Sequence, residues 1–293
     1  MATYTNLASL EGLQVGDVVT YTSTTAFDTK GYKFEVKLYG GRTTYTSFSS
    51  YKTVFGGAAI FKIDTSLLPS KILTYSASGG YSLCYGEIYD AYYRIGVAGS
   101  AGKAGRAVNA SSNAGGTGGG SVGGTGKGGS YTGATGGTQT SGGSGVGSGQ
   151  KGSFGAGGAG GNECGRGGDG WYGGGGGGYY SSYTGAGGGS GFIIGVSTTT
   201  YPSGYLGDDT SLQSTIASAI SEGKLTQGGS DGTVSTGMIL TILELPPVEG
   251  EPQSTLKYFN GTDFIDTNAK YYNGSELVNC DVYYYDGTEL KKI

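Results

Sequence analysis

The stretch GGDGWYGGGGGGYYSSYTGAGGGSGFIIG, residues 167–195, combines long glycine runs with aromatic residues and ends in an apolar triplet. Glycine recurs there at every third position, at Gly167, Gly170, Gly173 and Gly176. A repeat of three residues is the period of polyproline II. A strand with glycine in this register has one bare edge, where a neighbouring strand can approach closely. We therefore predict that the stretch belongs to a bundle of polyproline-II-like strands.

The same spacing recurs through a tract that runs from Gly99 to Gly191, and glycine makes up 65 of the 293 residues. Further runs are Gly120, Gly123, Gly126 and Gly129, then Gly152, Gly155, Gly158 and Gly161, and then Gly185, Gly188 and Gly191. So few large apolar side chains cannot order the tract by hydrophobic burial, which leaves hydrogen bonding between packed strands. The runs are short and the chain has 5 prolines, which excludes a collagen triple helix. Several short strands folded back on each other are expected.

Both flanks of the tract read as β-structure. In YKFEVKLY, residues 32–39, aromatic and aliphatic residues alternate with charged ones, as in a half-buried strand. The other predicted strands are Val18–Thr22, Ala58–Ile63, Lys71–Tyr75, Tyr92–Val97, Phe192–Ile194 and Met238–Leu245. Turn residues separate these runs at short intervals, which is typical of a β-sandwich. We predict a mainly β fold, a jelly-roll-like sandwich with the glycine bundle inserted, and Met238–Leu245 returning to its core.

One helix is predicted, over Asp208–Ser221. Leu212, Ile216 and Ile220 recur at helical spacing, and Gly223 would stop the helix. Asp208 and Asp209 form the most obvious acidic pair in the chain, and either can cap this helix. The cap explains the pair better than a pair of catalytic carboxylates does.

The last residues contain a tandem repeat. LKYFNGTDFIDTN, AKYYNGSELVNCD and VYYYDGTELKKI each place aromatic residues before Asn-Gly or Asp-Gly, and Gly261, Gly274 and Gly287 are 13 residues apart. Asn-Gly and Asp-Gly between strand formers signal a hairpin with a type I′ turn. We therefore predict a sandwich domain over residues 1–246 with the bundle at about 99–191, a linker over 247–255, and three β-hairpin repeats over 256–293.

Three stretches before the glycine tract, one that runs into it and one within it resemble the glycine-rich protein family, which includes the glycine-rich domain of anaplastic-lymphoma-kinase-type receptors and many phage and bacterial proteins. They are YKFEVKLYGG, GGAAIFKI, KILTYSASGG, YRIGVAGSAGKAG and the stretch over residues 167–195. The resemblance implies a β-sandwich with a polyglycine bundle. Phage tail-fibre adhesins are similar in using such a bundle, with receptor-binding loops at its tip. The sequence departs from the family where Ser100, Lys103 and Arg106 interrupt the glycine run.

Composition excludes several kinds of chemistry. The chain has no histidine, which excludes Ser-His-Asp and Cys-His catalysis. Cys84, Cys164 and Cys280 are far apart and odd in number, so neither a disulfide framework nor a metal site is indicated. A net charge of -4 without a basic cluster gives no reason to expect nucleic acid. The amino-terminal residues have no signal-peptide pattern, and no run is apolar enough for a membrane helix.

The candidate binding residues are aromatic. They are Tyr131, Phe154, Trp171, Tyr172, Tyr179, Tyr180 and Tyr183. Tyr and Trp offer large, rigid and amphipathic contact surfaces, which suits sugar stacking and protein recognition. The alternative is that these side chains pack over the bundle and shield its hydrogen bonds. Asp169 partly matches a calcium-binding glycine repeat, but such a site needs tandem copies, and scattered residues such as Lys103 and Arg166 read as solvated edges.

The sequence thus favours a non-enzymatic phage virion tail or fibre protein that mediates attachment to a host-surface glycan or protein, or tail assembly. It would act in the virion, as a homo-oligomer for which a trimer is the natural guess, without cofactor, metal, nucleic acid or membrane. A bacterial surface or cell-wall adhesin is one alternative. A carboxylate-based polysaccharide depolymerase is a second, and an ice-binding protein is a third.

Overall fold

The computed structural model describes residues 1–47, 50–78, 80–88, 90–105, 113–129, 131–179, 182–197, 200–228 and 237–246, together with the strands between Leu256 and Lys292. The chain divides into two units, Met1–Pro246 and Pro247–Ile293. The regular secondary structure of both is mainly β-strand, as predicted. In the described part, no helix is long and apolar enough to span a bilayer.

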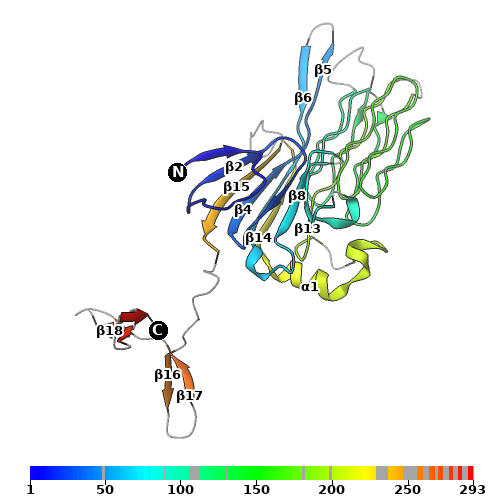
Figure 1. Cartoon of the computed structure of the whole chain (residues 1–293). Helices are drawn as coiled ribbons and strands as arrows, with labels where there is room; N and C mark the ends of the chain where they lie inside the picture. Colours follow the sequence, from blue (N-terminus) through cyan, green and yellow to red (C-terminus); the bar gives the residue numbers. More distant parts are fainter. Residues whose placement is uncertain are drawn as a thin grey trace. The chain divides into compact units, whose positions relative to one another are not determined.

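Two sheets form the framework of the first unit (Figure 1). The six-stranded sheet has the order β1 (Thr3–Thr5), β2 (Val18–Tyr21), β15 (Gly237–Glu244), β4 (Lys33–Tyr39), β7 (Ala58–Asp64) and β14 (Ile220–Thr226). The five-stranded sheet has the order β13 (Phe192–Ile193), β10 (Arg94–Val97), β9 (Ser82–Tyr85), β8 (Ile72–Ser76) and β3 (Thr25–Asp28). All neighbours are antiparallel except β1 and β2, which are parallel. Strand β15 lies between β2 and β4, so the predicted return of this apolar strand to the core is confirmed.

The two sheets share one hydrophobic core. In β4 the alternation seen in the sequence is real, because Phe34, Val36 and Leu38 are buried while the residues between them are half-buried. Gly96 of β10 lies against Phe61 of β7 at a point where a methyl group would be 2.6 Å from the Phe61 ring. Glycine at this position therefore lets the facing sheets pack closely.

The glycine tract folds into a bundle of short segments that run alternately away from the sheets and back. The segments are 99–105, 113–120, 122–128, 131–138, 141–146, 149–153, 156–161, 164–170, 172–178 and 184–191. Within them, two short strands form, β11 (Lys127–Gly128) and β12 (Tyr131–Thr132). The remaining backbone bonds link segments outside any sheet, as the scarcity of apolar side chains requires.

Segments 172–178 and 184–191, the inner segments, each bond to six neighbouring segments. Along 172–178 the partner changes with a period of three. The N–H groups of Gly173 and Gly176 donate to segment 149–153, and those of Gly174 and Gly177 donate to segment 164–170. The carbonyls follow the same period, with 173 and 176 accepting from segment 141–146 and 174 and 177 from segment 156–161. An inner segment is therefore approached from every side.

This arrangement explains why residues 173–178 are all glycine. A methyl group on Gly175 would overlap the Ser144 carbonyl oxygen and lie 2.7 Å from the Gly145 nitrogen. At Gly174 it would overlap the Gly187 carbonyl, on another side of the segment. The peripheral segments need glycine only on the side that faces a neighbour, so they tolerate residues such as Lys103 and Lys151, which are exposed.

A further hairpin, β5 (Thr43–Ser47) and β6 (Ser50–Val54), projects beside the bundle in Figure 1. The helical part is shorter than predicted. A 3-10 turn, η3 (Tyr205–Asp208), precedes α1 (Thr210–Ser218), which Asp209 caps by accepting a 2.9 Å bond from the Leu212 amide. The helix ends early because Ile220 opens β14 and pairs with Ile63 of β7. Two other 3-10 turns are η1 (Thr65–Leu67) and η2 (Ala91–Tyr93), the second of which occupies the start of the predicted strand Tyr92–Val97.

The second unit contains three two-stranded hairpins. They are β16 (Leu256–Phe259) with β17 (Phe264–Thr267), β18 (Lys270–Tyr272) with β19 (Leu277–Asn279), and β20 (Tyr283–Tyr285) with β21 (Leu290–Lys292). Phe259 pairs with Phe264, and the equivalent pairs recur in the other two hairpins. The Asn-Gly and Asp-Gly turns, predicted as type I′, lie outside the described residues. Cys280 lies outside the described residues.

Candidate functional site

The connections of the bundle lie at two ends. At one end, which we call the base, the segments join the sheets: the Gly57 amide bonds to the Gly99 carbonyl at 2.9 Å, and the Gly120 amide bonds to the Thr226 carbonyl at 3.0 Å. The turns at the other end, which we call the distal turns, follow segments 122–128, 141–146, 156–161 and 172–178. In Figure 1 they extend away from the sheets. Among the described residues, the predicted aromatic residues divide between these two ends.

Trp171, Tyr172 and Phe154 lie together at the base. The Trp171 ring is fully buried and stacks on Phe192 with a centroid distance of 3.7 Å and an interplanar angle of 8°. Phe154 meets its edge at 4.7 Å, and the indole N–H donates to the Gln139 carbonyl at 3.2 Å. These contacts fix the end of an inner segment in the hydrophobic core. Trp171 therefore has a packing role, which was the alternative to ligand binding, and no ligand can reach its ring in this arrangement.

Tyr131, Tyr179 and Tyr183 lie on the distal turns. Tyr131 is 50% exposed and Tyr179 is 45% exposed. The Tyr179 and Tyr183 rings are 5.0 Å apart at 54°, and the two residues form an isolated antiparallel bridge across the connection between the inner segments. Tyr180 lies outside the described residues.

The neighbouring turns converge on this connection. The Ser182 hydroxyl donates to the Gly128 carbonyl at 3.3 Å, which joins the 179–183 connection to the turn that carries Tyr131. The Tyr183 hydroxyl donates to Glu163 Oε2 at 3.3 Å. Exposed phenol rings, hydroxyls and one carboxylate therefore come together at the end of a hydrogen-bonded bundle. Such a set can stack on and hydrogen-bond to a polar ligand.

Glu163 belongs to this surface, although no clear pattern in the sequence pointed to it. Asn162 and Glu163 both have positive φ, 42° and 62°, because the turn between segments 156–161 and 164–170 is tight. The Asn-Glu pair between glycine runs is the one local sign of such a turn. Burial raises the pKa of the neighbouring Cys164 thiol, so this thiol stays protonated near neutral pH.

The acidic residues singled out in the sequence have structural partners. Asp209 caps α1, and Asp208 accepts a 2.7 Å bond from the Gly204 amide. Asp169 pairs with Arg166 at 2.7 Å and also accepts from the Gly157 amide at 2.7 Å. Within the described residues, no group of three or more Cys, Asp or Glu side chains is placed to hold a metal ion.

Comparison with family models, curated proteins and solved structures gave no match for this chain. The resemblance to the glycine-rich family therefore stays a prediction from the sequence.

Proposed function

We propose that this protein is a non-enzymatic component of a phage tail or fibre that attaches to a host-surface glycan or protein through its distal turns. The observation that carries the proposal is the combination of a closely packed, hydrogen-bonded bundle with exposed tyrosines at its free end. Turns accept substitutions readily, whereas most positions in the bundle interior have no room for a residue larger than glycine. A binding surface on such turns can therefore vary while its support stays constant.

The proposal includes a finer description of the fold. In it, the two sheets form a jelly-roll-like sandwich and the inserted segments are polyproline-II strands. The period-three hydrogen bonding along the inner segments supports the second assignment, because polyproline II has three residues per turn. The repeat hairpins would dock to other tail subunits or to further copies of this chain, a trimer being the symmetry expected of a fibre.

The chemistry of the distal turns favours a carbohydrate or a polar protein loop as the ligand. Aromatic rings held in place lose little conformational entropy on binding. Glu163 and the serine and tyrosine hydroxyls supply acceptors and donors for sugar hydroxyls. Attachment of this kind needs no bond-breaking chemistry, and the acidic residues Asp169, Asp208 and Asp209 are each engaged in the hydrogen bonds described above.

Binding of the fluorescently labelled protein to a panel of intact bacteria tests the proposal, with and without enzymatic removal of surface polysaccharide. Saturable binding to a few strains is expected. Tyr179→Ala and Tyr131→Ala should each weaken it about tenfold or more, as for truncated hot-spot residues. Tyr92→Ala is the matched control, because Tyr92 is a 38% exposed tyrosine that contacts Phe154 at the base.

Loss of binding after polysaccharide removal would identify a glycan receptor, and retained binding would identify a protein receptor. If the well-folded protein binds none of the strains, attachment is refuted and a role in tail assembly takes its place. Equal losses for the distal and base variants would show that the distal turns are not the binding surface.

A further inference from the structure

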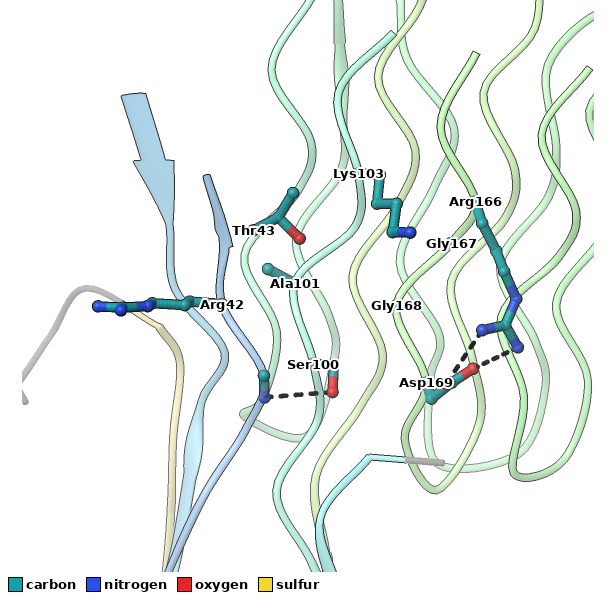
Figure 2. A pocket seen from close by; sticks show the side chains of 10 residues that line it. Arg42, Thr43, Ser100, Ala101, Lys103, Arg166, Gly167, Gly168 and Asp169 are labelled. Atoms are coloured by element: carbon teal, nitrogen blue, oxygen red, sulfur yellow. Dashed lines mark hydrogen bonds and ion pairs between the residues drawn. The ribbon is translucent and has the colours of Figure 1, made fainter. Parts of the chain in front are cut away.

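A hollow of about 160 Å³ lies between the start of β5 and the side of the bundle (Figure 2). Three cationic side chains line it, from Arg42, Lys103 and Arg166, together with the Asp169 carboxylate. The other lining residues are Gly41, Thr43, Ser100, Ala101, Gly167 and Gly168. The hollow is separate from the distal turns and from the buried aromatic residues at the base.

The period of the bundle puts these side chains on one face. Residues three apart lie on the same row of a three-fold strand, so Ser100 and Lys103 share a row, and Arg166 and Asp169 share another. The two rows are adjacent, because the Lys103 amide donates to the Arg166 carbonyl at 3.0 Å and the Ser100 amide donates to the Asp169 carbonyl at 2.8 Å. Ser100 and Lys103 are also two of the residues that interrupt the glycine run.

Positive charge is in excess in this hollow, although the whole chain carries a net charge of -4. Asp169 is already engaged by both Arg166 Nη atoms, at 2.7 and 3.2 Å, and by the Gly157 amide. No carboxylate among the described residues pairs with Lys103 or Arg42. The Arg166–Asp169 pair is neutral overall, so the exposed Lys103 beside it leaves this surface with a net positive charge and free hydrogen-bond donors.

The side chains do not contribute equally. In Figure 2 the Lys103 ammonium and the Arg166 guanidinium lie on the bundle side, whereas the Arg42 guanidinium extends away from them. Lys103 and Arg166 therefore supply the charge as the hollow stands. Thr43 and Ser100 also line the hollow with their hydroxyls, and the Ser100 Oγ accepts a 3.3 Å bond from the Gly41 amide.

We infer that this hollow binds the carboxylate of an acidic sugar residue. Lysine and arginine would hold the carboxylate, and the Thr43 and Ser100 hydroxyls would bond to ring hydroxyls. The volume is well below the roughly 300 Å³ at which ordinary small-molecule pockets begin. It suits one charged residue of a chain that continues along the open side of the hollow. That the sugar comes from a host-surface polysaccharide rests on the proposed function, whereas the site itself does not.

Isothermal titration of the full-length protein with a uronic-acid oligosaccharide, at low ionic strength, tests the inference. The matched neutral oligosaccharide and inorganic phosphate serve as comparison ligands. Lys103→Gln should weaken uronate binding about tenfold, since a hydrogen bond to a charged group is lost. Lys151→Gln should leave it unchanged, because Lys151 is an exposed bundle lysine that does not line the hollow. Lys103→Gln/Arg166→Gln should abolish it.

Lys103 and Lys151 are both exposed, so their glutamine variants should fold normally. Circular dichroism before the titration checks this. Equal affinity for the neutral and acidic oligosaccharides, or equal loss in the two lysine variants, would overturn the inference. Phosphate binding as tight as uronate binding would show an adventitious ion only and would overturn it as well. Uronate binding by a protein that attaches to no bacterium would leave this site standing and refute the proposed function alone.

Discussion

Alanine at Gly175 should destabilise the protein more than alanine does at a glycine with open space around it, such as Gly86. A methyl group there overlaps the Ser144 carbonyl oxygen and lies 2.7 Å from the Gly145 nitrogen, and these are backbone atoms that no rotamer change can move. Overpacking a tight interior costs about 1–3 kcal/mol. The Gly175 amide bond to the Thr135 carbonyl (3.0 Å) and the Gly187 amide bond to the Gly175 carbonyl (2.9 Å) would also be strained. At about 0.5–1.5 kcal/mol each, the whole effect is about 2–6 kcal/mol.

Urea unfolding followed by circular dichroism and tryptophan fluorescence measures this change, because Trp171 reports on the base of the bundle. Gly86→Ala is the matched control. Gly86 has a φ of 76°, with no atom within 4 Å of an added methyl group, so alanine there meets backbone strain alone. That strain is worth about 1–2 kcal/mol. If Gly175→Ala destabilises no more than Gly86→Ala, the inner segments are not packed as described.

Three further outcomes are expected. Trp171→Ala should lower the free energy of unfolding by about 3–5 kcal/mol, because it empties a fully buried aromatic site; a near-neutral result in chemical denaturation would contradict its place in the core. Asp209→Ala should lower it by about 1 kcal/mol through loss of the α1 cap, measurable as a shift in the urea midpoint. Burial raises the pKa of Tyr21, Tyr75 and Tyr205 above the usual 10.0, so the folded state favours their neutral form. Their contribution to the free energy of unfolding is therefore intact below about pH 10 and is lost as the pH rises further. Tyrosinate absorbance during alkaline titration should therefore show a group of tyrosines that ionise together with unfolding.

Strongly patterned strands could be predicted from the sequence because each carries its own evidence of a buried face. The alternation in β4 and the apolar run of β15 decide their places between neighbouring strands. The hairpin β5–β6 was missed because it is rich in threonine, serine and tyrosine and pairs with itself, so no apolar periodicity marks it. The end of α1 was also misplaced, because pairing of Ile220 with Ile63 overrides a local pattern that continues the helix.

The glycine spacing predicted that a bundle exists, but not which aromatic residues it buries. Trp171 and Tyr179 flank the same glycine run, and nothing local distinguishes them. Their surroundings differ because the run starts at the sheets and ends at a free turn. The hollow beside Lys103 could not be seen either, since its two rows come from segments more than 60 residues apart, with Lys103 on one and Arg166 on the other. Such placement depends on the order in which the segments pack.

The bundle also changes how the protein should respond to temperature. Unfolding residues 99–191 releases amides and carbonyls to water far more than apolar side chains. Exposure of polar surface lowers the heat capacity by about 0.26 cal/K/mol per Å², whereas exposure of apolar surface raises it by about 0.45. The heat capacity increment of this chain should therefore fall below the roughly 12–15 cal/mol/K per residue of ordinary domains. A small heat capacity of unfolding flattens the curve of the free energy of unfolding against temperature. A molecule built on hydrogen-bonded glycine should therefore stay stable over a wide range, at low as well as at high temperature.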